Sequence, residues 1–248
     1  MYRINIIWLI LLLSSCVVVQ DGGSKKEKAS KINVQLGIGY YNQGNIEVAN
    51  EKLVKALQQD PKSSQAHHAY AVLQNRFLDK DKAEIHFKKA VEFDDENSEA
   101  LNNYGTFLCK QKRFEEAEKM FVQSIKNPLY RSPEVAYTNA AVCLLDAGDQ
   151  HLIKAKTYLL KALAVGNNYR PALLKMSEIT FDEKDYKLST LYLERYHLVG
   201  QPTARSLWLA IRNNLEQEQA LRANELADKL KQDFPGSAEY KSWLALEK

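Results

Sequence analysis

Small and large apolar residues recur along the chain with the spacing of one helix face. Each set has a small residue, a large apolar residue four positions later and another small residue three positions after that. Residues three and four apart lie on the same side of an α-helix. The sets are Ala49/Leu53/Ala56, Ala83/Phe87/Ala90, Ala117/Phe121/Ser124 and Ala155/Leu159/Ala162. Because the first three are 34 residues apart and the fourth 38 residues further on, the pattern predicts a repeated helical unit.

Each unit also contains an earlier helix that packs on the one just described. Gly37 and Gly105 occupy equivalent positions in that earlier helix and predict a close approach between the two helices. Turn residues separate the helices or end the units, namely Gly44, Gly148, Pro61, Pro128 and Pro235. The sequence therefore predicts helix-turn-helix units throughout.

A 34-residue helix-turn-helix period resembles the tetratricopeptide repeat (TPR). The resemblance implies an all-α fold, a right-handed superhelical solenoid of about six repeats over residues 30–236. The repeats are expected to start near residues 30, 64, 98, 134, 170 and 204, with a two-residue insertion at Gln150 and His151. Residues 237–248 are expected to form a capping helix with Tyr240, Trp243, Leu244 and Leu246 on one side.

The N-terminus has a different pattern. An apolar run over residues 6–13, too short to span a bilayer, is followed by Ser14, Ser15 and Cys16. Residues 13–16 resemble the lipobox of bacterial lipoproteins, which implies a signal peptide at 1–15, acylation of Cys16 and a membrane anchor. An uncleaved anchor helix or an incidental cysteine is the alternative. Residues 16–29, rich in Gly, Ser and Lys, are expected to form a flexible tether.

Residue 17 bears on the membrane. Lipoproteins kept in the inner membrane commonly carry Asp after the acylated cysteine, whereas this chain has Val17. The resemblance therefore implies the periplasmic face of the outer membrane.

Charge and composition exclude several classes of protein. The net charge of +3 gives no footprint for nucleic acid, and the 45% hydrophobic content argues against disorder. Besides Cys16 there are two cysteines, Cys109 and Cys143. They lie on the first helices of adjacent repeats, which predicts a disulfide, although two buried thiols would also fit a helical core.

The sequence has no motif of enzyme chemistry. It lacks a phosphate-binding loop, a pair of zinc-binding histidines, a Cys-x-x-Cys pair and a nucleophile elbow. The five histidines are scattered over different repeats, and adjacent His67 and His68 point about 100° apart on a helix. We therefore expect no enzyme, no metal, no cofactor and no small-molecule substrate.

TPR solenoids bind peptides or proteins in the groove lined by the first helix of each pair. The expected groove residues are Ile38, Tyr41, His68, Val72, Asn75, Asn102, Thr106, Val142 and Leu145. Some of them could simply contact the neighbouring helix instead.

Two stretches resemble a more specific family. Residues 102–121 (NNYGTFLCKQKRFEEAEKMF) and 204–240 are similar to the type IV pilus biogenesis/stability lipoproteins, the PilF/PilW pilotin family. The resemblance implies that the chain binds the outer-membrane secretin and promotes its multimerisation. Two other hypotheses stay open: a TPR lipoprotein of another envelope complex, in outer-membrane protein assembly or cell-wall enzyme recruitment, and a scaffold that binds peptidoglycan.

Overall fold

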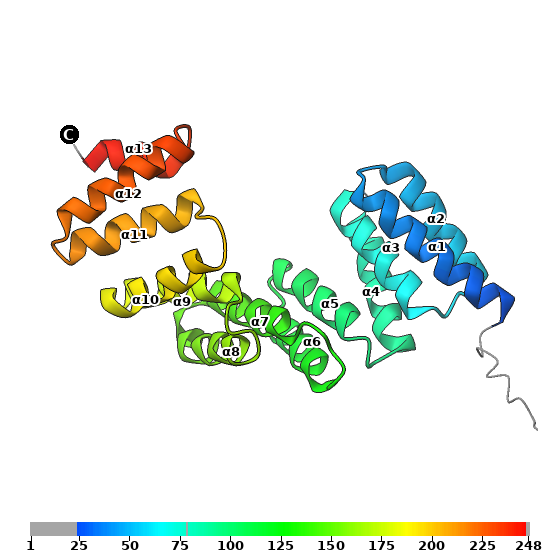
Figure 1. Cartoon of the computed structure of the whole chain (residues 1–248). Helices are drawn as coiled ribbons and strands as arrows, with labels where there is room; N and C mark the ends of the chain where they lie inside the picture. The colour runs from blue at the N-terminus through cyan, green and yellow to red at the C-terminus, as the bar shows by residue number, and fades with distance from the viewer. Residues whose placement is uncertain (1–23, 78, 247–248) are drawn as a thin grey trace, which may run out of the picture.

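The computed structural model describes residues 24–77 and 79–246, and these residues form helices joined by short turns, with no strand among them. Figure 1 shows their order along the chain. The helices are α1 (Lys25–Asn42), α2 (Ile46–Gln59), α3 (Ser64–Phe77), α4 (Lys80–Phe93), α5 (Ser98–Lys110), α6 (Phe114–Lys126), α7 (Pro133–Ala147), the 3₁₀ turn η1 (Asp149–His151), α8 (Leu152–Val165), α9 (Arg170–Asp182), α10 (Tyr186–Leu198), α11 (Ala204–Glu216), α12 (Ala220–Asp233) and α13 (Ala238–Leu246).

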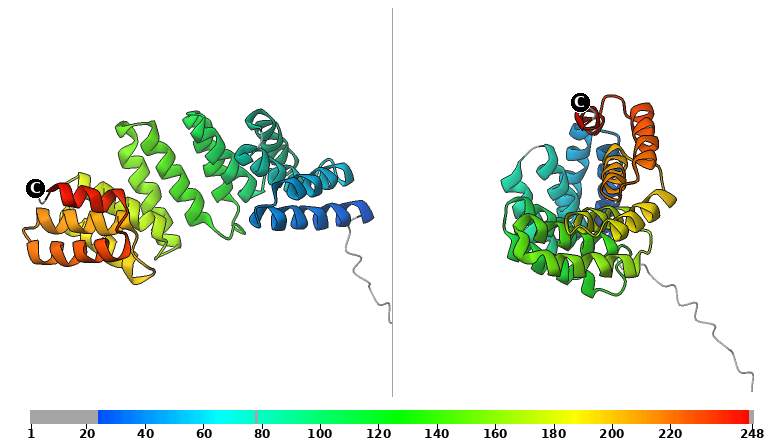
Figure 2. Two further views of the ribbon diagram at one scale, coloured as in Figure 1. Left: turned by 90° about the horizontal axis from the view of Figure 1, so that it is seen from above. Right: turned by 90° about the vertical axis from the view of Figure 1, so that its left-hand side faces the viewer.

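Successive helices pair, and each pair stacks on the next. α1 packs on α2, α3 on α4, and so on to α11 on α12, while each second helix also contacts the first helix of the next pair. The stack curves, so the views in Figures 1 and 2 show an arch with α1 near one end and α13 at the other. The predicted all-α TPR solenoid is confirmed.

The recurring apolar sets form the interior of each pair. Alanines 49, 56, 83, 90, 117, 155 and 162 are fully buried, as are Leu53, Phe87, Phe121 and Leu159. Alanine lets the partner helix approach, and the large side chain between two alanines fills the space beside it. Each such large residue stabilises its pair by about 2 to 3 kcal/mol through removal of apolar area from water.

Glycine sets the closest approach in two pairs. A Cβ on Gly37 would lie 2.6 Å from Leu53 Cγ, and one on Gly105 would lie 2.8 Å from Phe121 Cε1. Real Cβ atoms do not approach neighbours this closely, so the first helix can lie against the large residue of the second only because these positions lack a side chain.

The first helix begins earlier than expected. The hydroxyl of Ser24 accepts a hydrogen bond from the Glu27 N–H, and the Glu27 carboxylate accepts one from the Ser24 N–H. This capping box starts α1 at Lys25. The prediction of a flexible tether over 16–29 is therefore wrong for residues 25–29, which are the first turn and a half of a helix.

The later first helices begin at Ser64, Ser98, Pro133, Arg170 and Ala204, against expected starts near 64, 98, 134, 170 and 204. The insertion at Gln150 and His151 forms η1, so the extra residues lengthen one turn without breaking the stack.

Helix α13 lies against α11 and α12 at the C-terminal end. The ring of Trp243 is buried in a cluster that includes Leu207, Ile211 and Leu230. Tyr240 also packs there, whereas Leu244 and Leu246 are 40% and 62% exposed. Those two leucines therefore do not share the buried side as expected, because the short helix turns them away from the cluster.

Helices α5 and α7 are also linked covalently. Cys109 and Cys143 form a disulfide, with Cα atoms 5.7 Å apart. This separation lies within the usual range for a disulfide.

The predicted signal peptide at 1–15 and the predicted acylation site, Cys16, lie outside the described residues. Within residues 24–77 and 79–246, none of the helices has the length and apolar character needed to cross a membrane.

Candidate functional site

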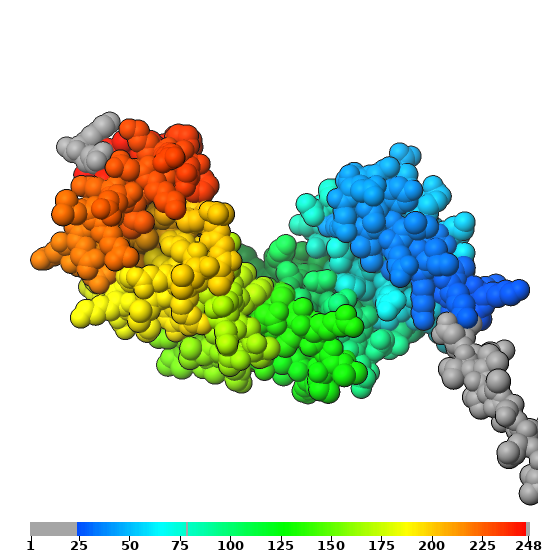
Figure 3. All heavy atoms as spheres, viewed as in Figure 1, coloured from blue at the N-terminus to red at the C-terminus, as the bar shows by residue number. Residues whose placement is uncertain are grey.

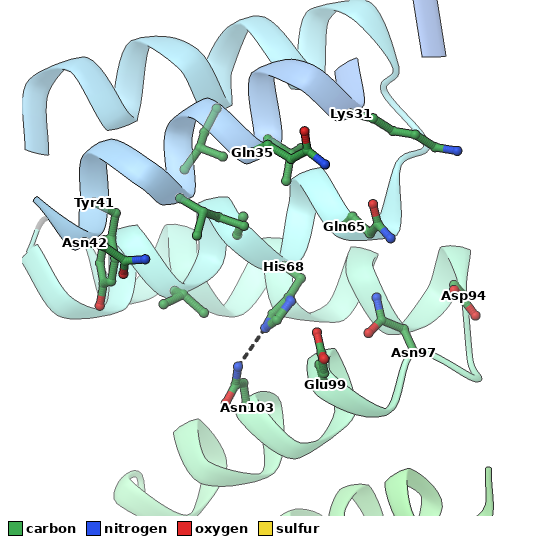
Figure 4. Close-up of a pocket in the computed structure, with 15 residues that line it drawn as sticks. Lys31, Gln35, Tyr41, Asn42, Gln65, His68, Asp94, Asn97, Glu99 and Asn103 are labelled. Atoms are coloured by element: carbon green, nitrogen blue, oxygen red, sulfur yellow. Dashed lines mark hydrogen bonds between the residues drawn. The ribbon is translucent and has the colours of Figure 1, made fainter. Parts of the chain in front are cut away.

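A groove of about 770 Å³ opens on the first helices of the N-terminal repeats. Side chains of α1, α3 and α5 line it, together with Leu53 of α2 and the turn that follows α4 (Figure 4). In the space-filling view of Figure 3 the surface on this side of the arch is hollowed between its two ends. The lining residues are Lys31, Val34, Gln35, Ile38, Tyr41, Asn42, Leu53, Gln65, His68, Ala69, Val72, Asp94, Asn97, Glu99 and Asn103.

The floor of the groove is apolar. Val34, Leu53 and Ala69 are buried, Val72 is half-buried, and Ile38 is 44% exposed. An apolar side chain of a partner that covers Ile38 and Val72 would remove both from water, which favours binding. The floor therefore fits a partner with one or two projecting apolar side chains.

Carboxamides line the walls. Gln35, Asn42 and Gln65 are exposed, and their side chains make no hydrogen bond within the described residues, so their amide groups are available to a partner. Each carboxamide can donate and accept at once, as the peptide group of an extended chain also does. Asn97 has a structural role instead, because its Oδ1 accepts the Ala100 N–H.

One wall carries a fixed pair. Asn103 Nδ2 lies 2.7 Å from His68 Nε2, so the amide donates and the imidazole must carry its proton on Nδ1 (Figure 4). Burial lowers the pKa of His68 to about 4. His68 is therefore neutral at neutral pH, and it offers the groove a polar but uncharged surface.

Charged residues stand around the same opening. Lys31 lies on the α1 side of the opening, whereas Asp94 and Glu99 lie on the other side, in the turn after α4 and on α5. Opposite charges on two sides of a groove favour one direction of a bound segment over the other.

Tyr41 is positioned by the next repeat. Arg76 Nη1 donates a hydrogen bond to Tyr41 Oη at 3.0 Å. The Tyr41 and Phe77 rings meet edge to face with centroids 5.8 Å apart, and the Arg76 guanidinium lies over both rings. These contacts fix the phenol at the end of the groove farthest from Lys31.

Four of the expected groove residues line this groove: Ile38, Tyr41, His68 and Val72. Asn75, Thr106, Val142 and Leu145 lie on α3, α5 and α7 outside it, all partly buried. Thr106 donates its hydroxyl to the Asn102 carbonyl, and Leu145 packs against the core.

The prediction for Asn102 is wrong. Its side chain is 6% exposed and its Oδ1 accepts a hydrogen bond from Asn139 Nδ2 of α7. Asn103, one position on and about 100° around the helix, faces the groove instead.

The 34-residue period could have found the missed positions. The groove is lined by equivalent residues of three repeats, Lys31/Gln65/Glu99 and Gln35/Ala69/Asn103. If Gln35 is placed on the concave face of α1, Asn103 is predicted to lie there too, because it occupies the equivalent position two repeats later.

The comparisons with known proteins agree with this architecture. Residues 86–119 match the tetratricopeptide repeat model. The chain is 32% identical over 249 residues to the type IV pilus assembly protein PilF of Pseudomonas aeruginosa (strain PAO1), and the match covers 98% of each protein.

The chain belongs to the PilF family.

Two solved structures extend the relationship. The structure of Pseudomonas aeruginosa PilF, at 33% identity, superposes with a TM-score of 0.80 and covers 91% of this chain and 100% of that one. The structure of PilW, described as a widely conserved type IV pilus biogenesis factor, superposes with a TM-score of 0.77 at 27% identity, over 87% of this chain and 98% of that one. The PilF-family resemblance expected from residues 102–121 and 204–240 is confirmed over nearly the whole chain.

His67 and His86 form a second histidine contact in this PilF-family chain. His67 Nδ1 and His86 Nδ1 are 2.8 Å apart, and His67 Nε2 is 3.0 Å from the Pro61 carbonyl. His67 thus donates from Nε2 and accepts from His86. Within the described residues no group of three or more His, Cys, Asp or Glu side chains could hold a metal ion. The relatives are TPR proteins of pilus biogenesis rather than enzymes.

Proposed function

We propose that the chain is a pilotin, an outer-membrane lipoprotein that binds a subunit of the type IV pilus secretin and promotes its localisation and multimerisation. The single observation that carries the proposal is the groove on α1, α3 and α5, an apolar floor with carboxamide walls in a chain of the PilF family. Such a groove fits a segment of a partner protein.

The groove suits an extended segment. Equivalent positions recur once per repeat, so the groove presents side chains at a regular interval along the axis of the solenoid. In the proposed complex one apolar side chain of the secretin subunit covers Ile38 and Val72, and Gln35, Gln65 and Asn103 bond to its main chain. Asn103 can do so while it stays bonded to His68, because its Oδ1 and its second N–H are left for a partner.

The anchor supplies the location. In the proposal Cys16 carries acyl chains and holds the protein on the periplasmic face of the outer membrane. Secretin subunits bound to anchored pilotins are concentrated on one surface. A higher local concentration favours the closed ring over single subunits without any chemical step.

The test compares variants of groove residues with a variant of an exposed residue outside the groove. We expect Ile38→Asp, and Tyr41→Ala combined with Val72→Asp, to abolish binding of the purified secretin subunit in a pull-down or by surface plasmon resonance. The control is Ile153→Asp on α8, a residue 82% exposed outside the groove, which should bind normally. Circular dichroism should show the same helical signature for all variants. Equal binding by groove and control variants would exclude this groove.

The cellular test concerns the secretin itself. A strain that lacks the chain should hold the secretin as monomers or in the wrong membrane, and should lose surface pili and twitching motility. Normal heat-resistant secretin multimers in the outer membrane of that strain would refute the pilotin assignment. The PilF-family fold would stand, and the partner would be another envelope complex.

A further inference from the structure

The side of α1 that faces away from the solenoid carries basic and apolar side chains in one row. Lys25, Lys28, Ile32 and Leu36 follow one another at intervals of three and four residues, so they lie on one face of the helix. All four are exposed, Ile32 by 56% and Leu36 by 44%. We refer to these four residues as the outer stripe.

The outer stripe lies at an end of the stack. The buried residues of α1, Ser30, Asn33, Val34 and Gly37, lie on the other side of the helix, toward α2 and α3. Those two helices are the neighbours of α1 in the described chain. In Figures 1 and 3 α1 forms the outer surface where the chain enters the fold.

The net charge of the chain is concentrated at this end. Residues 16–46, which remain after the proposed cleavage before Cys16, contain four basic side chains, Lys25, Lys26, Lys28 and Lys31, against only Asp21 and Glu27. Their balance of +2 is the whole net charge of residues 16–248, because the basic and acidic side chains of residues 47–248 are equal in number. The excess of positive charge therefore stands beside two exposed aliphatic side chains. Basic and aliphatic residues together are the composition of a helix that lies on an anionic lipid surface.

Chain length keeps the outer stripe close to the proposed anchor. Ser24, the N-cap of α1, follows Cys16 by eight residues. Eight residues span at most about 28 Å, and a flexible chain of that length averages roughly 16 Å. The attraction between lysines and a charged surface extends over a Debye length of about 8 to 10 Å. Only the component of that average along the membrane normal counts, roughly 9 Å, so an acyl chain on Cys16 would hold Lys25 within that range.

We propose that the outer stripe rests on the surface of the membrane that holds the protein. Lys25 and Lys28 contact the phosphates of anionic phospholipids, and Ile32 and Leu36 enter the headgroup region. The inference rests on the proposed acylation of Cys16 and goes beyond partner binding, because it assigns an orientation to the solenoid.

The orientation has a direct consequence for the groove. With the outer stripe on the membrane, the remaining repeats stack away from the lipid. Lys31, Gln35 and Ile38 lie on the adjacent face of the same helix and line the groove. The groove then opens sideways just above the lipid surface, so a partner segment bound there stays next to the membrane.

The experiment uses the lipidated full chain, reconstituted in vesicles of phosphatidylcholine alone or mixed with phosphatidylglycerol. A nitrobenzoxadiazole probe is attached at Leu36→Cys, or at the matched control Leu221→Cys on α12, which is 84% exposed. Cys109 and Cys143 are joined in the disulfide and leave the new thiol as the labelling site. Nitroxide-labelled phospholipid then reports which probe touches the bilayer.

We expect several-fold stronger quenching of the probe at position 36 than at 221 in the phosphatidylglycerol vesicles. The difference should be lost at high salt and when Lys25, Lys26 and Lys28 are all replaced by Gln. Equal quenching at both positions overturns the proposal. So does a probe at 36 that iodide cannot reach and nitroxide lipid does not quench, because protein, such as a second copy, then covers the outer stripe. Secretin binding by the Lys→Gln variant stays normal if the proposed function holds, which separates the two tests.

Discussion

The ring of Phe121 fills the space that a side chain at Gly105 would need. A Cβ at position 105 would lie 2.8 Å from Phe121 Cε1, 2.9 Å from Phe121 Cδ1 and 3.1 Å from the Ala117 carbonyl oxygen. The contact joins the two helices of the third repeat. Gly37 and Leu53 form the equivalent contact in the first repeat. Glycine therefore determines how closely these helix pairs pack.

Replacement of Gly105 by Ala should destabilise the fold. The methyl group would gain up to about 1 kcal/mol of helix propensity but would force Phe121 or a backbone out of place, at a cost of about 1 to 3 kcal/mol. We expect a net loss of about 1 to 2 kcal/mol, measured by urea denaturation. Gly39→Ala is the matched control, because a Cβ there meets nothing within 4 Å, and it should stabilise by up to about 1 kcal/mol. The explanation fails if both variants shift stability the same way.

Reduction of the disulfide should lower stability. Cys109 and Cys143 close a loop of 34 residues in sequence, and the chain-entropy model gives about 3 to 4 kcal/mol for a loop of this size. Thermal unfolding with and without reductant should show a lower midpoint in the reduced protein. The double variant Cys109→Ala with Cys143→Ala should already unfold at the lower midpoint and ignore the reductant. A wild-type midpoint that does not respond to reductant would contradict the prediction.

Stability should fall as the pH drops from about 6.5 toward 4. Burial lowers the pKa of His68 to about 4, and burial together with the charge of His67 lowers the pKa of His86 to about 4. The unfolded chain, with histidine pKa values near 6.5, then binds protons that the folded chain does not, so the stabilisation present above pH 6.5 is lost in this window.

His68→Gln tests this pH dependence directly. The difference in free energy of unfolding between pH 7.5 and pH 5 should shrink by about 1 to 2 kcal/mol relative to the wild type, because one such group is removed. Urea titrations at the two pH values measure it. Parallel pH profiles for the two proteins would show that His68 titrates alike in the folded and unfolded states.

Cys16→Ala should release the protein from membranes without unfolding it. The repeats begin beyond this position, so the helical signature should persist while the chain moves to the soluble fraction. Intact-mass measurement of the wild type provides the independent check. A wild-type mass without acyl chains would rule out the lipoprotein hypothesis.

The repeat and the groove could be predicted to different extents. The core sets were readable because alanine and a large apolar residue must recur on one helix face for helices to stack. The orientation of Asn102 could not be predicted. Asn102 and Asn103 differ by one position around the helix, and asparagine fits both a buried hydrogen-bonded position and the wall of a groove. The start of α1 was obscured by composition: lysines beside Gly and Ser suggested a tether, while the Ser24/Glu27 capping box and the helix-forming Lys and Ala residues that follow it begin a helix.

The link between Cys109 and Cys143 also determines the order in which the array opens. In a stack whose repeats touch mainly their neighbours, fraying starts at the two termini and unzips inward. Because a covalent bond joins the third and fourth repeats, we expect the centre to be the last part to exchange its amide hydrogens. Most of the groove lies on α1 and α3, outside the two linked repeats, so a segment bound there should stabilise the repeats that open first.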